Sequence, residues 1–243
     1  MLKKQRQELI TNYLNEHRFA RVAALAKAAN STEITTRRDI NELHELGLLK
    51  KVYGGAQALD LITEDVSFTS RIDENLSVKE AVAKKASEYI KDGMRVYLDA
   101  GSSTHCLIPF LKDFDIQVFT HGVHHVNELS KYGVNTHLIG GDLKLDTLAT
   151  VGASTIIYLE QFRFDIAFMG TNAIDMHQGF MTPDVTEAMV KRRIIELSEE
   201  TYILADYSKF NRASNVVFAG KDIPIITNRK VSKDYIDFDI RVI

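Results

Sequence analysis

The sequence predicts an α/β body with a mostly parallel sheet, preceded by a small domain built mainly from helices. From residue 78 onward, helical and extended apolar segments alternate, which is typical of layered α/β folds. Charge separates the two parts, since residues 1–56 carry ten Lys/Arg and six Asp/Glu, a net of +4. The whole chain is at −3, so the remainder is at −7. We expect a head at 1–57, a linker with some contact to the next domain at 58–77, and a body at 78–243.

Composition excludes several classes of protein. The apolar fraction of 45% is ordinary for a globular protein with a proper core. No apolar run approaches the roughly 18 residues of a membrane span, and the first ten residues show no signal-peptide pattern. Cys106 is the only cysteine, which excludes an internal disulfide and a cysteine-based zinc site. We therefore expect a cytoplasmic protein that does not bind membranes and needs no cofactor.

Three helices are predicted in the head. Apolar residues recur at helical spacing in 3–16, in 22–29 and in the segment that follows residue 30. Asn30 or Ser31 is expected to cap the third helix, with Glu33 three positions after Asn30 making a near capping box. Gly47 is expected to end that helix, because the residue after a helix often adopts the left-handed conformation that glycine tolerates.

A short basic hairpin follows the third helix and ends in Gly54-Gly55, which completes the layout of a winged helix-turn-helix. In such folds the third helix presents its N-terminal residues to base edges in the DNA major groove, and the wing follows the phosphate backbone. The candidates for DNA contact are Thr32, Thr35, Thr36, Arg37, Arg38, Lys50, Lys51 and Tyr53. Arg37 and the two lysines would contact phosphates, while Thr35, Thr36 and Arg38 would reach base edges.

The alternative for this helix is a solvated amphipathic helix with its charges facing water. A basic head on an acidic body favours the DNA interpretation, because it confines phosphate neutralisation to the head.

The body alternates between the two kinds of segment. Helices are expected at 78–90, 104–111, 125–131, 154–161 and 184–199, and strands at 95–98, 116–120, 135–139, 165–169, 201–205 and 223–227.

Small or polar loops follow five of these strands. They are 99–104 (DAGSST), 120–122 (THG), 140–142 (GGD), 170–172 (GTN) and 206–209 (DYSK). Ligands of open α/β sheets gather at the carboxyl ends of the strands, so the five loops predict one shared pocket. In the first loop, Gly101 lets the backbone approach an anion, and Ser102, Ser103 and Thr104 supply donors at a helix start. The sequence contains no Walker phosphate loop.

Motifs in both parts resemble those of the DeoR-type bacterial transcriptional regulators. The head carries T-E-I-T-T-R-R-D-I at 32–40 and G-L-L-K-K-V-Y-G-G-A at 47–56. The body carries marks of the same regulators at Lys79, 99–104, 120–121, 140–141, Gly170, Glu187, Lys191 and 206–210. Three positions depart from the family pattern: Thr36 replaces an aliphatic residue, Tyr53 replaces a histidine, and His121 replaces an asparagine.

The resemblance implies a body similar in fold to ribose-5-phosphate isomerase, glucosamine-6-phosphate deaminase and CoA-transferase-like enzymes. It implies a transcriptional repressor of a sugar-catabolism operon that binds double-stranded operator DNA and is released by a phosphorylated sugar, with fructose 1-phosphate the favoured hexose phosphate. It also implies a homodimer or homotetramer.

The resemblance places the ligand phosphate at Ser102, Ser103 and Thr104, with Asp99, Glu187 and Lys209 facing the sugar. The full set of expected effector contacts is Lys79, Asp99, Gly101, Ser102, Ser103, Thr104, Thr120, His121, Gly141, Gly170, Glu187, Asp206 and Lys209.

Two other functions stay open at this point. Asp99, Glu187 and Lys209 can move protons, so the body could be a sugar-phosphate isomerase or deaminase that carries a DNA-binding head. The body could also serve only to oligomerise a DNA-binding protein.

Two further clusters were considered as sites. The spacing of His121, His124 and His125 is not a standard zinc pattern, so we expect no metal. The basic run 191–193 is interpreted as a helix face with one member near the pocket rather than as a second DNA-binding patch.

Overall fold

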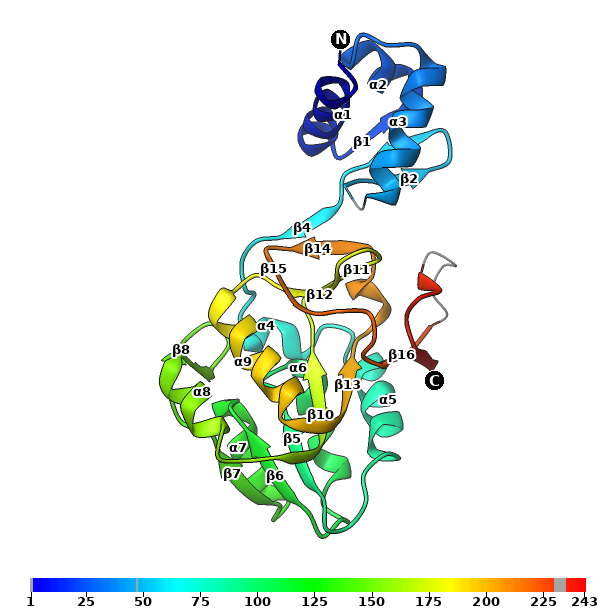
Figure 1. Ribbon diagram of the computed structural model, residues 1–243. Coiled ribbons are helices and arrows are strands. Elements are labelled where there is room, and N and C mark those ends of the chain that lie inside the picture. Colours follow the sequence, from blue (N-terminus) through cyan, green and yellow to red (C-terminus); the bar gives the residue numbers. More distant parts are fainter. Residues whose placement is uncertain (1, 47, 230–234) are drawn as a thin grey trace.

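The computed structural model describes residues 2–46, 48–229 and 235–243 and places a small head at one end of a larger body (Figure 1). The three predicted helices and the wing of the head are confirmed. The elements are α1 (Lys3–His17), β1 (Phe19–Arg21), α2 (Val22–Ala28), α3 (Glu33–Glu45), β2 (Lys50–Val52) and β3 (Gly55–Gln57). Strand β3 pairs antiparallel with both β1 and β2, so the wing is a three-stranded sheet.

Apolar side chains from all three helices form the core of the head. Ile10 and Leu14 of α1, Leu25 of α2, and Ile40 and Leu43 of α3 are at most 2% exposed. Their spacing of three or four residues places each set on one helix face. The opposite face of α3 is therefore free to meet a partner.

The start of α3 differs from the expectation. Thr32 is the N-cap, and its hydroxyl accepts a hydrogen bond from the Thr35 amide at 3.3 Å. Asn30 has φ +44° and forms the turn before the helix, while Glu33 is the first helical residue. Neither Asn30 nor Ser31 is therefore the cap, and the capping box expected from Glu33 is wrong. The expected stop at Gly47 lies outside the described residues.

The body is built on a parallel sheet, as the alternating pattern predicted. Its order among the described residues is β17-β16-β13-β10-β5-β6-β7, and every neighbouring pair is parallel. These strands are β5 (Arg95–Leu98), β6 (Gln117–Thr120), β7 (Asn135–Leu138), β10 (Phe164–Gly170), β13 (Ser198–Leu204), β16 (Ile225–Thr227) and β17 (Ile240–Val242).

Helices cover both faces of this sheet (Figure 1). One core joins α5 (Leu76–Ser87), the 3-10 turn η1 (Ile108–Phe110) and α7 (Val123–Lys131) to one face. The other core joins α8 (Ala153–Leu159) and α9 (Val185–Glu196) to the opposite face. The helix expected at 104–111 is instead split into α6 (Ser102–His105) and η1. Pro109 lies in η1, and proline lacks the amide hydrogen that a continuous helix needs.

Small sheets that the alternating pattern did not predict lie over the carboxyl ends of the central strands. β11 (Ala173–Asp175), β12 (Gly179–Thr182) and β15 (Val216–Ala219) form one antiparallel sheet. β8 (Asp142–Lys144) pairs with β9 (Ala149–Val151).

The segment 58–77, expected to be a linker, is folded onto the body. It contains β4 (Asp60–Ile62), which pairs in parallel with β14 (Arg212–Ser214), and α4 (Phe68–Ile72). Phe68 is 7% exposed and packs on His105 and His124 of the body. Residues 60–72 therefore contact the body, while Ala58 is buried in the core of the head.

Two sets of contacts join the head to the body. Arg18, which follows α1, forms an ion pair with Asp60 of β4 and donates a hydrogen bond to the Leu59 carbonyl at 3.3 Å. His177, between β11 and β12, has Nε2 at 2.9 Å from the His44 carbonyl near the end of α3. The pieces of the body that lie over the sheet therefore also touch the head.

The close approach of β3 to β1 predicts that the wing requires glycine at position 55. A Cβ on Gly55 would overlap the Ala20 carbonyl and lie 3.0 Å from the Arg21 Cα. Gly55→Ala is expected to destabilise the head by about 1–3 kcal/mol, as overpacking does in other cores. Amide hydrogen exchange of the peptides that cover residues 19–57 measures this loss.

The matched control is Gly140→Ala, because an added Cβ there meets no atom within 4 Å. Equal exchange in the head of the two variants would contradict the requirement for glycine.

Candidate functional site

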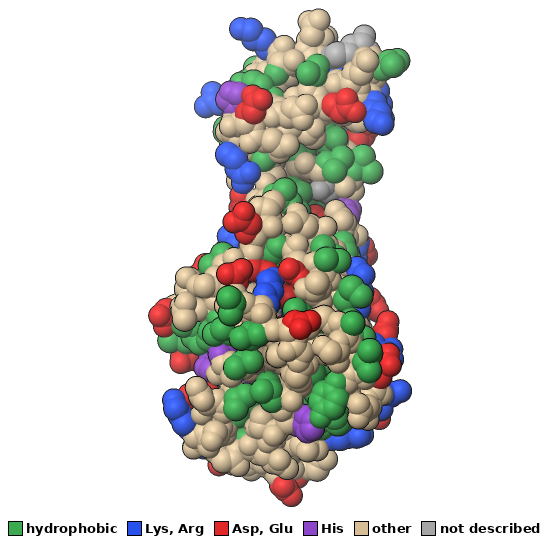
Figure 2. All heavy atoms as spheres, turned by 90° about the vertical axis from the view of Figure 1, so that its left-hand side faces the viewer, with side chains coloured by type: hydrophobic (Ala, Val, Ile, Leu, Met, Phe, Trp, Pro, Cys, Tyr) green, Lys and Arg blue, Asp and Glu red, His purple; other side chains and the backbone are tan. Residues whose placement is uncertain are grey.

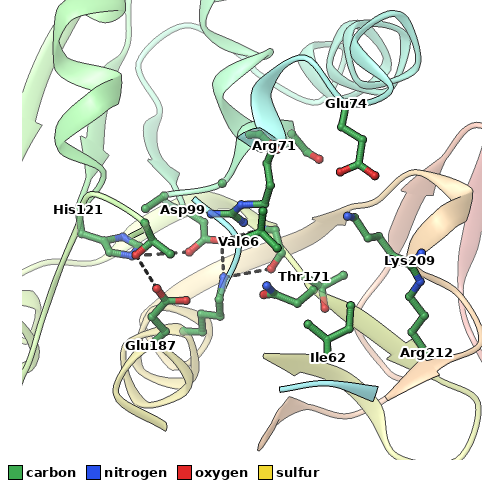
Figure 3. Close-up of a pocket in the computed structure, with 18 residues that line it drawn as sticks. Ile62, Val66, Arg71, Glu74, Asp99, His121, Thr171, Glu187, Lys209 and Arg212 are labelled. Atoms are coloured by element: carbon green, nitrogen blue, oxygen red, sulfur yellow. Dashed lines mark hydrogen bonds and ion pairs between the residues drawn. The ribbon is translucent and has the colours of Figure 1, made fainter. Parts of the chain in front are cut away.

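A cavity of about 190 Å³ lies at the carboxyl ends of β5, β6, β10 and β13 (Figure 3). This is the volume of roughly six water molecules in the liquid, so the cavity suits one small polar molecule. Its walls come from the loops after these strands, from α9, from β14 and from the segment that contains β4 and α4. The expectation of one shared pocket thus agrees with the structure for four of the five loops.

A buried ion pair forms the floor of the pocket. Asp99, at the end of β5, is 2% exposed and pairs with Lys191 of α9. The same carboxylate accepts a hydrogen bond from the Gly170 amide at 2.8 Å, and Lys191 donates one to the Gly170 carbonyl at 3.1 Å. Burial raises the pKa of Asp99, but Lys191, His121 and the Gly170 amide outweigh it, so the pKa is lowered. Asp99 is therefore ionised at neutral pH.

His121 lies beside this pair as a neutral imidazole. Its Nδ1 is 2.7 Å from the Tyr97 hydroxyl, and its Nε2 is 3.7 Å from an Asp99 oxygen. Burial lowers the pKa of His121 to about 4, even though the charge of Asp99 raises it. His121, one of the three residues that depart from the family pattern, thus presents an uncharged ring to the pocket.

Glu187, in the first turn of α9, is held in place by Thr147 and Lys144. It accepts a hydrogen bond from the Thr147 hydroxyl at 2.7 Å and lies 3.3 Å from Lys144. Lys144 also pairs with Asp65 and, at 3.1 Å, with Asp184, the N-cap of α9. Burial lowers the pKa of Lys144, but these carboxylates outweigh it and raise the pKa. Lys144 therefore joins α9, β8 and the segment after β4 through charge.

The opposite end of the pocket is cationic. Figure 3 shows Lys209 and Arg212 together on the side away from Asp99 and His121, with Arg71 entering from α4. The Nε and Nη2 atoms of Arg71 are buried and have no hydrogen-bond partner in the described parts of the chain. An unpaired buried donor costs about 1–3 kcal/mol. Arg71 is therefore the side chain with the most to gain from an anionic ligand.

The glycine-serine loop contributes as expected, with one correction. Gly101, Ser102 and Ser103 line the cavity. Thr104 is fully buried, and its hydroxyl hydrogen bonds to the carbonyls of Asp99 and Gly101. Thr104 therefore shapes the loop and does not face the ligand.

Eight of the thirteen expected effector residues line the cavity. They are Asp99, Gly101, Ser102, Ser103, His121, Gly170, Glu187 and Lys209.

Besides Thr104, four other expected contacts do not line the cavity. Lys79 is 2% exposed and donates a hydrogen bond to the Arg71 carbonyl. Thr120 lies 3.1 Å from Nδ1 of His125, and Asp206 caps η2 (Tyr207–Lys209). Gly141 packs against Thr155, so a Cβ there would collide with that side chain. All four lie around the pocket rather than in its lining, and their contact with an effector stays a prediction.

Sequence reasoning missed part of the lining. The missed residues are Ile62, Val66, Arg71, Glu74, Ala100, Thr147, Thr171, Asn172 and Arg212. Four of them lie in 58–77, where periodicity is weak. Three of them, Ala100, Thr171 and Asn172, belong to the loops 99–104 and 170–172, which the strand pattern had already marked. The sequence identified Lys191 only as a residue typical of the family. In the structure it forms the ion pair with Asp99 on the floor of the pocket.

The DNA-facing candidates of the head are exposed, with one exception. Thr32, Arg37, Arg38, Lys51 and Tyr53 are exposed, and Thr35 and Lys50 are half-buried. A groove between α3 and the wing separates Arg37 from Lys51 and Tyr53. Figure 2 shows Lys and Arg side chains projecting from the head.

Thr36 is fully buried between the helices. The expectation that it reaches a base edge is therefore wrong.

Comparisons with known proteins agree with these two parts. The family model described as "DeoR-like helix-turn-helix domain" matches residues 6–61, and "DeoR C terminal sensor domain" matches residues 74–228. The chain is 38% identical to the uncharacterized HTH-type transcriptional regulator FruR of Bacillus subtilis, over 93% of this chain and 91% of that protein. It is 28% identical to the lactose phosphotransferase system repressor of Streptococcus mutans, over 87% of this chain and 86% of that protein.

A solved ribose 5-phosphate isomerase A from Methanocaldococcus jannaschii resembles part of the chain. The identity is 19% and the TM-score 0.43, over 56% of this chain and 55% of that one.

None of the described helices is both long and apolar enough to cross a membrane.

The Bacillus and Streptococcus relatives are named as a transcriptional regulator and a repressor, which favours a regulator over the enzyme alternative. Both halves of the chain match one family. The chain belongs to the DeoR family of helix-turn-helix transcriptional regulators, with a DNA-binding head and a sugar-sensor domain.

Proposed function

We propose that the chain is a cytoplasmic repressor of a sugar-catabolism operon, released from its operator by a phosphorylated sugar in the body. The observation that carries this proposal is the arrangement of charge in the pocket. Lys209 and Arg212 lie at one end, Asp99, His121 and Glu187 lie at the other, and Arg71 lies between them. A phosphate joined to a polyol has the same division between anion and hydrogen-bonding groups.

The cationic end matches a phosphate in charge. Lys191 is already neutralised by Asp99, so the pocket keeps Arg71, Lys209 and Arg212 against Glu74. Charge-assisted hydrogen bonds from guanidinium to phosphate oxygens are strong and often bidentate. Ser102 and Ser103 add hydroxyl donors from the neighbouring loop. The phosphate expected at the serine loop therefore gains Arg71 as its principal side-chain partner.

The other end matches sugar hydroxyls. Asp99 and Glu187 carry carboxylate acceptors, and His121 offers a neutral ring nitrogen. Thr171 and Asn172, at the end of β10, add neutral donors and acceptors. Hydroxyls both donate and accept, so this mixed set suits a sugar better than a second phosphate.

Switching requires the ligand to distinguish two arrangements of the heads. A shift from 1:99 to 99:1 needs roughly 5.5 kcal/mol of differential affinity. Ile62 of β4 lines the pocket, and Asp60 of the same strand pairs with Arg18 of the head. A ligand that moves β4 therefore changes how the head is held.

Two copies of the chain, as a homodimer or within a homotetramer, would place two heads on successive half-sites of double-stranded operator DNA. Fructose 1-phosphate is the first candidate effector among hexose phosphates. The name of the streptococcal relative, a lactose phosphotransferase system repressor, supports a sugar-derived ligand.

The first test is fluorescence anisotropy of the full chain on DNA from upstream of its own operon. A panel of sugar phosphates, with the free sugars as controls, is titrated at fixed salt. Release by one phosphorylated sugar and not by its free sugar is expected. Tight DNA binding that no compound changes would contradict the proposed release.

Arg38→Ala is expected to weaken specific DNA binding by about 1–3 kcal/mol, the range for losing a base-edge contact. Arg38 is exposed on α3 and forms no ion pair within the described chain. Anisotropy on operator and on scrambled DNA measures the change. Arg163→Ala, which removes an exposed charge from the body, is the matched control. Unchanged operator affinity would remove Arg38 from the interface.

Arg71→Gln and Lys209→Ala are each expected to raise the effector concentration that releases DNA by at least tenfold, about 1.4 kcal/mol. Both variants lose a cation that would meet the phosphate, while the DNA-binding face stays intact. Lys112→Ala, on the exposed surface of the body, controls for loss of charge. A wild-type response in both variants would place the phosphate elsewhere.

A further inference from the structure

We propose that His105, His124 and His125 form a second ligand site, for a divalent transition-metal ion of the zinc type. One nitrogen from each ring can be chosen so that the three atoms lie within 4.8 Å of one another. The site lies behind the serine loop and shares no residue with the pocket lining. It does not depend on the identity of the sugar or on the proposed repression.

The fold brings these residues together from two helices, α6 and α7. His105 is the last residue of α6, and His124 and His125 lie in the first turn of α7. The strands before these helices, β5 and β6, are paired neighbours, so α6 and α7 begin side by side. The sequence had grouped His121 with His124 and His125, but His121 faces Asp99 and Tyr97. His105 takes its place in the cluster.

Ring nitrogens of His105 and His124 are available to a ligand, whereas His125 would coordinate a metal through Nδ1 by giving up its contact with Thr120. Nδ1 of His105 is buried without a hydrogen-bond partner in the part of the chain described. Neither nitrogen of His124 has a hydrogen bond of normal geometry there, although the Leu148 backbone lies close enough to raise the pKa of His124. His125 has Nδ1 at 3.1 Å from the Thr120 hydroxyl and Nε2 at 3.4 Å from the Gly101 carbonyl. Buried polar atoms in native structures are normally paired, so nitrogens without partners beside one another indicate a missing ligand.

The protonation state suits a metal. Burial lowers the pKa of all three histidines, to about 3 for His124. His105 lowers the pKa of His124 further, and both of them lower that of His125. Neutral imidazole is the form that coordinates metal. Arg71 and Lys131 oppose a cation here, while Glu128, near His105, favours it.

The donor set selects the class of ion. Three imidazoles without a carboxylate suit Zn²⁺, Cu²⁺ or Ni²⁺ and not Mg²⁺ or Ca²⁺. Zinc binds nitrogen at about 2.0–2.1 Å, which places tetrahedral ligands roughly 3.4 Å apart. Nitrogens as far apart as 4.8 Å would therefore have to approach one another by up to roughly 1.4 Å to hold such an ion. A surface groove lined by His105, Cys106, Glu80 and Glu128 provides a path for entry.

A metal ion at this site would restrict the motion of residues 101–103, which line the pocket. α6 begins at Ser102 and ends at His105, and His125 contacts the Gly101 carbonyl. Fixing the three rings therefore fixes the segment that carries Gly101, Ser102 and Ser103 into the pocket. Occupancy of the metal site and of the pocket are then coupled.

The test uses the full chain without an added histidine tag, stripped of metal with a chelator. Zn²⁺ is titrated by calorimetry, and Co²⁺ is followed by visible absorption, which is intense for tetrahedral sites. One ion per chain and a tetrahedral Co²⁺ spectrum are expected. His124→Ala and His105→Gln should each weaken Zn²⁺ binding at least tenfold. His17→Ala, an exposed histidine of α1, should bind as the wild type does.

Far-UV circular dichroism checks that each variant is folded. One folded variant is enough to test whether the three histidines bind zinc. No zinc binding by the wild type would overturn the proposal. Zinc binding that a folded His124→Ala or His105→Gln variant retains in full would also overturn it, since the ion would then sit on other side chains.

Discussion

The buried ion pair between Asp99 and Lys191 is the interaction on which the rest of the body depends. It joins the end of β5 to the middle of α9, and the Gly170 amide and carbonyl add the end of β10. Removing charges from water is expensive, so such a pair is tolerated only when its remaining hydrogen bonds are satisfied. Losing one partner would leave an uncompensated buried charge, which typically destabilises by about 3–5 kcal/mol. The floor of the sensor pocket and the stability of the sheet therefore rest on the same atoms.

The segment between head and body connects sensing to DNA binding. β4 pairs with β14 in the body, while Asp60 of β4 pairs with Arg18 of the head. α4 follows in the same segment and carries Arg71 into the pocket. Phe68 of the same helix packs on His105 and His124. One stretch of about twenty residues thus touches the head, the pocket and the histidine cluster. A ligand bound at the head, the pocket or the histidine cluster therefore acts on a segment that the other two also contact.

Several parts of the fold and the site could be predicted because their signals are local. Periodicity identified the three helices of the head, and alternation identified the parallel strands. The loops after β5, β6, β10 and β13 stood out because small and polar residues follow apolar ones there, and these loops do line the cavity. Thr36 shows the limit of such reasoning. It lies among exposed polar neighbours in the sequence, yet the turn of the helix places it in the core.

The sequence by itself determined the two-part architecture, the basic head, the mostly parallel sheet and the serine loop at a strand end. These follow from residue spacing and charge within short windows. Only the tertiary structure decided which residues meet across long separations. Arg71 enters the pocket because β4 pairs with a strand some 150 residues later, and His105 joins His124 and His125 because β5 and β6 are neighbours. No short window records such pairings, because they are selected by the packing of the whole chain.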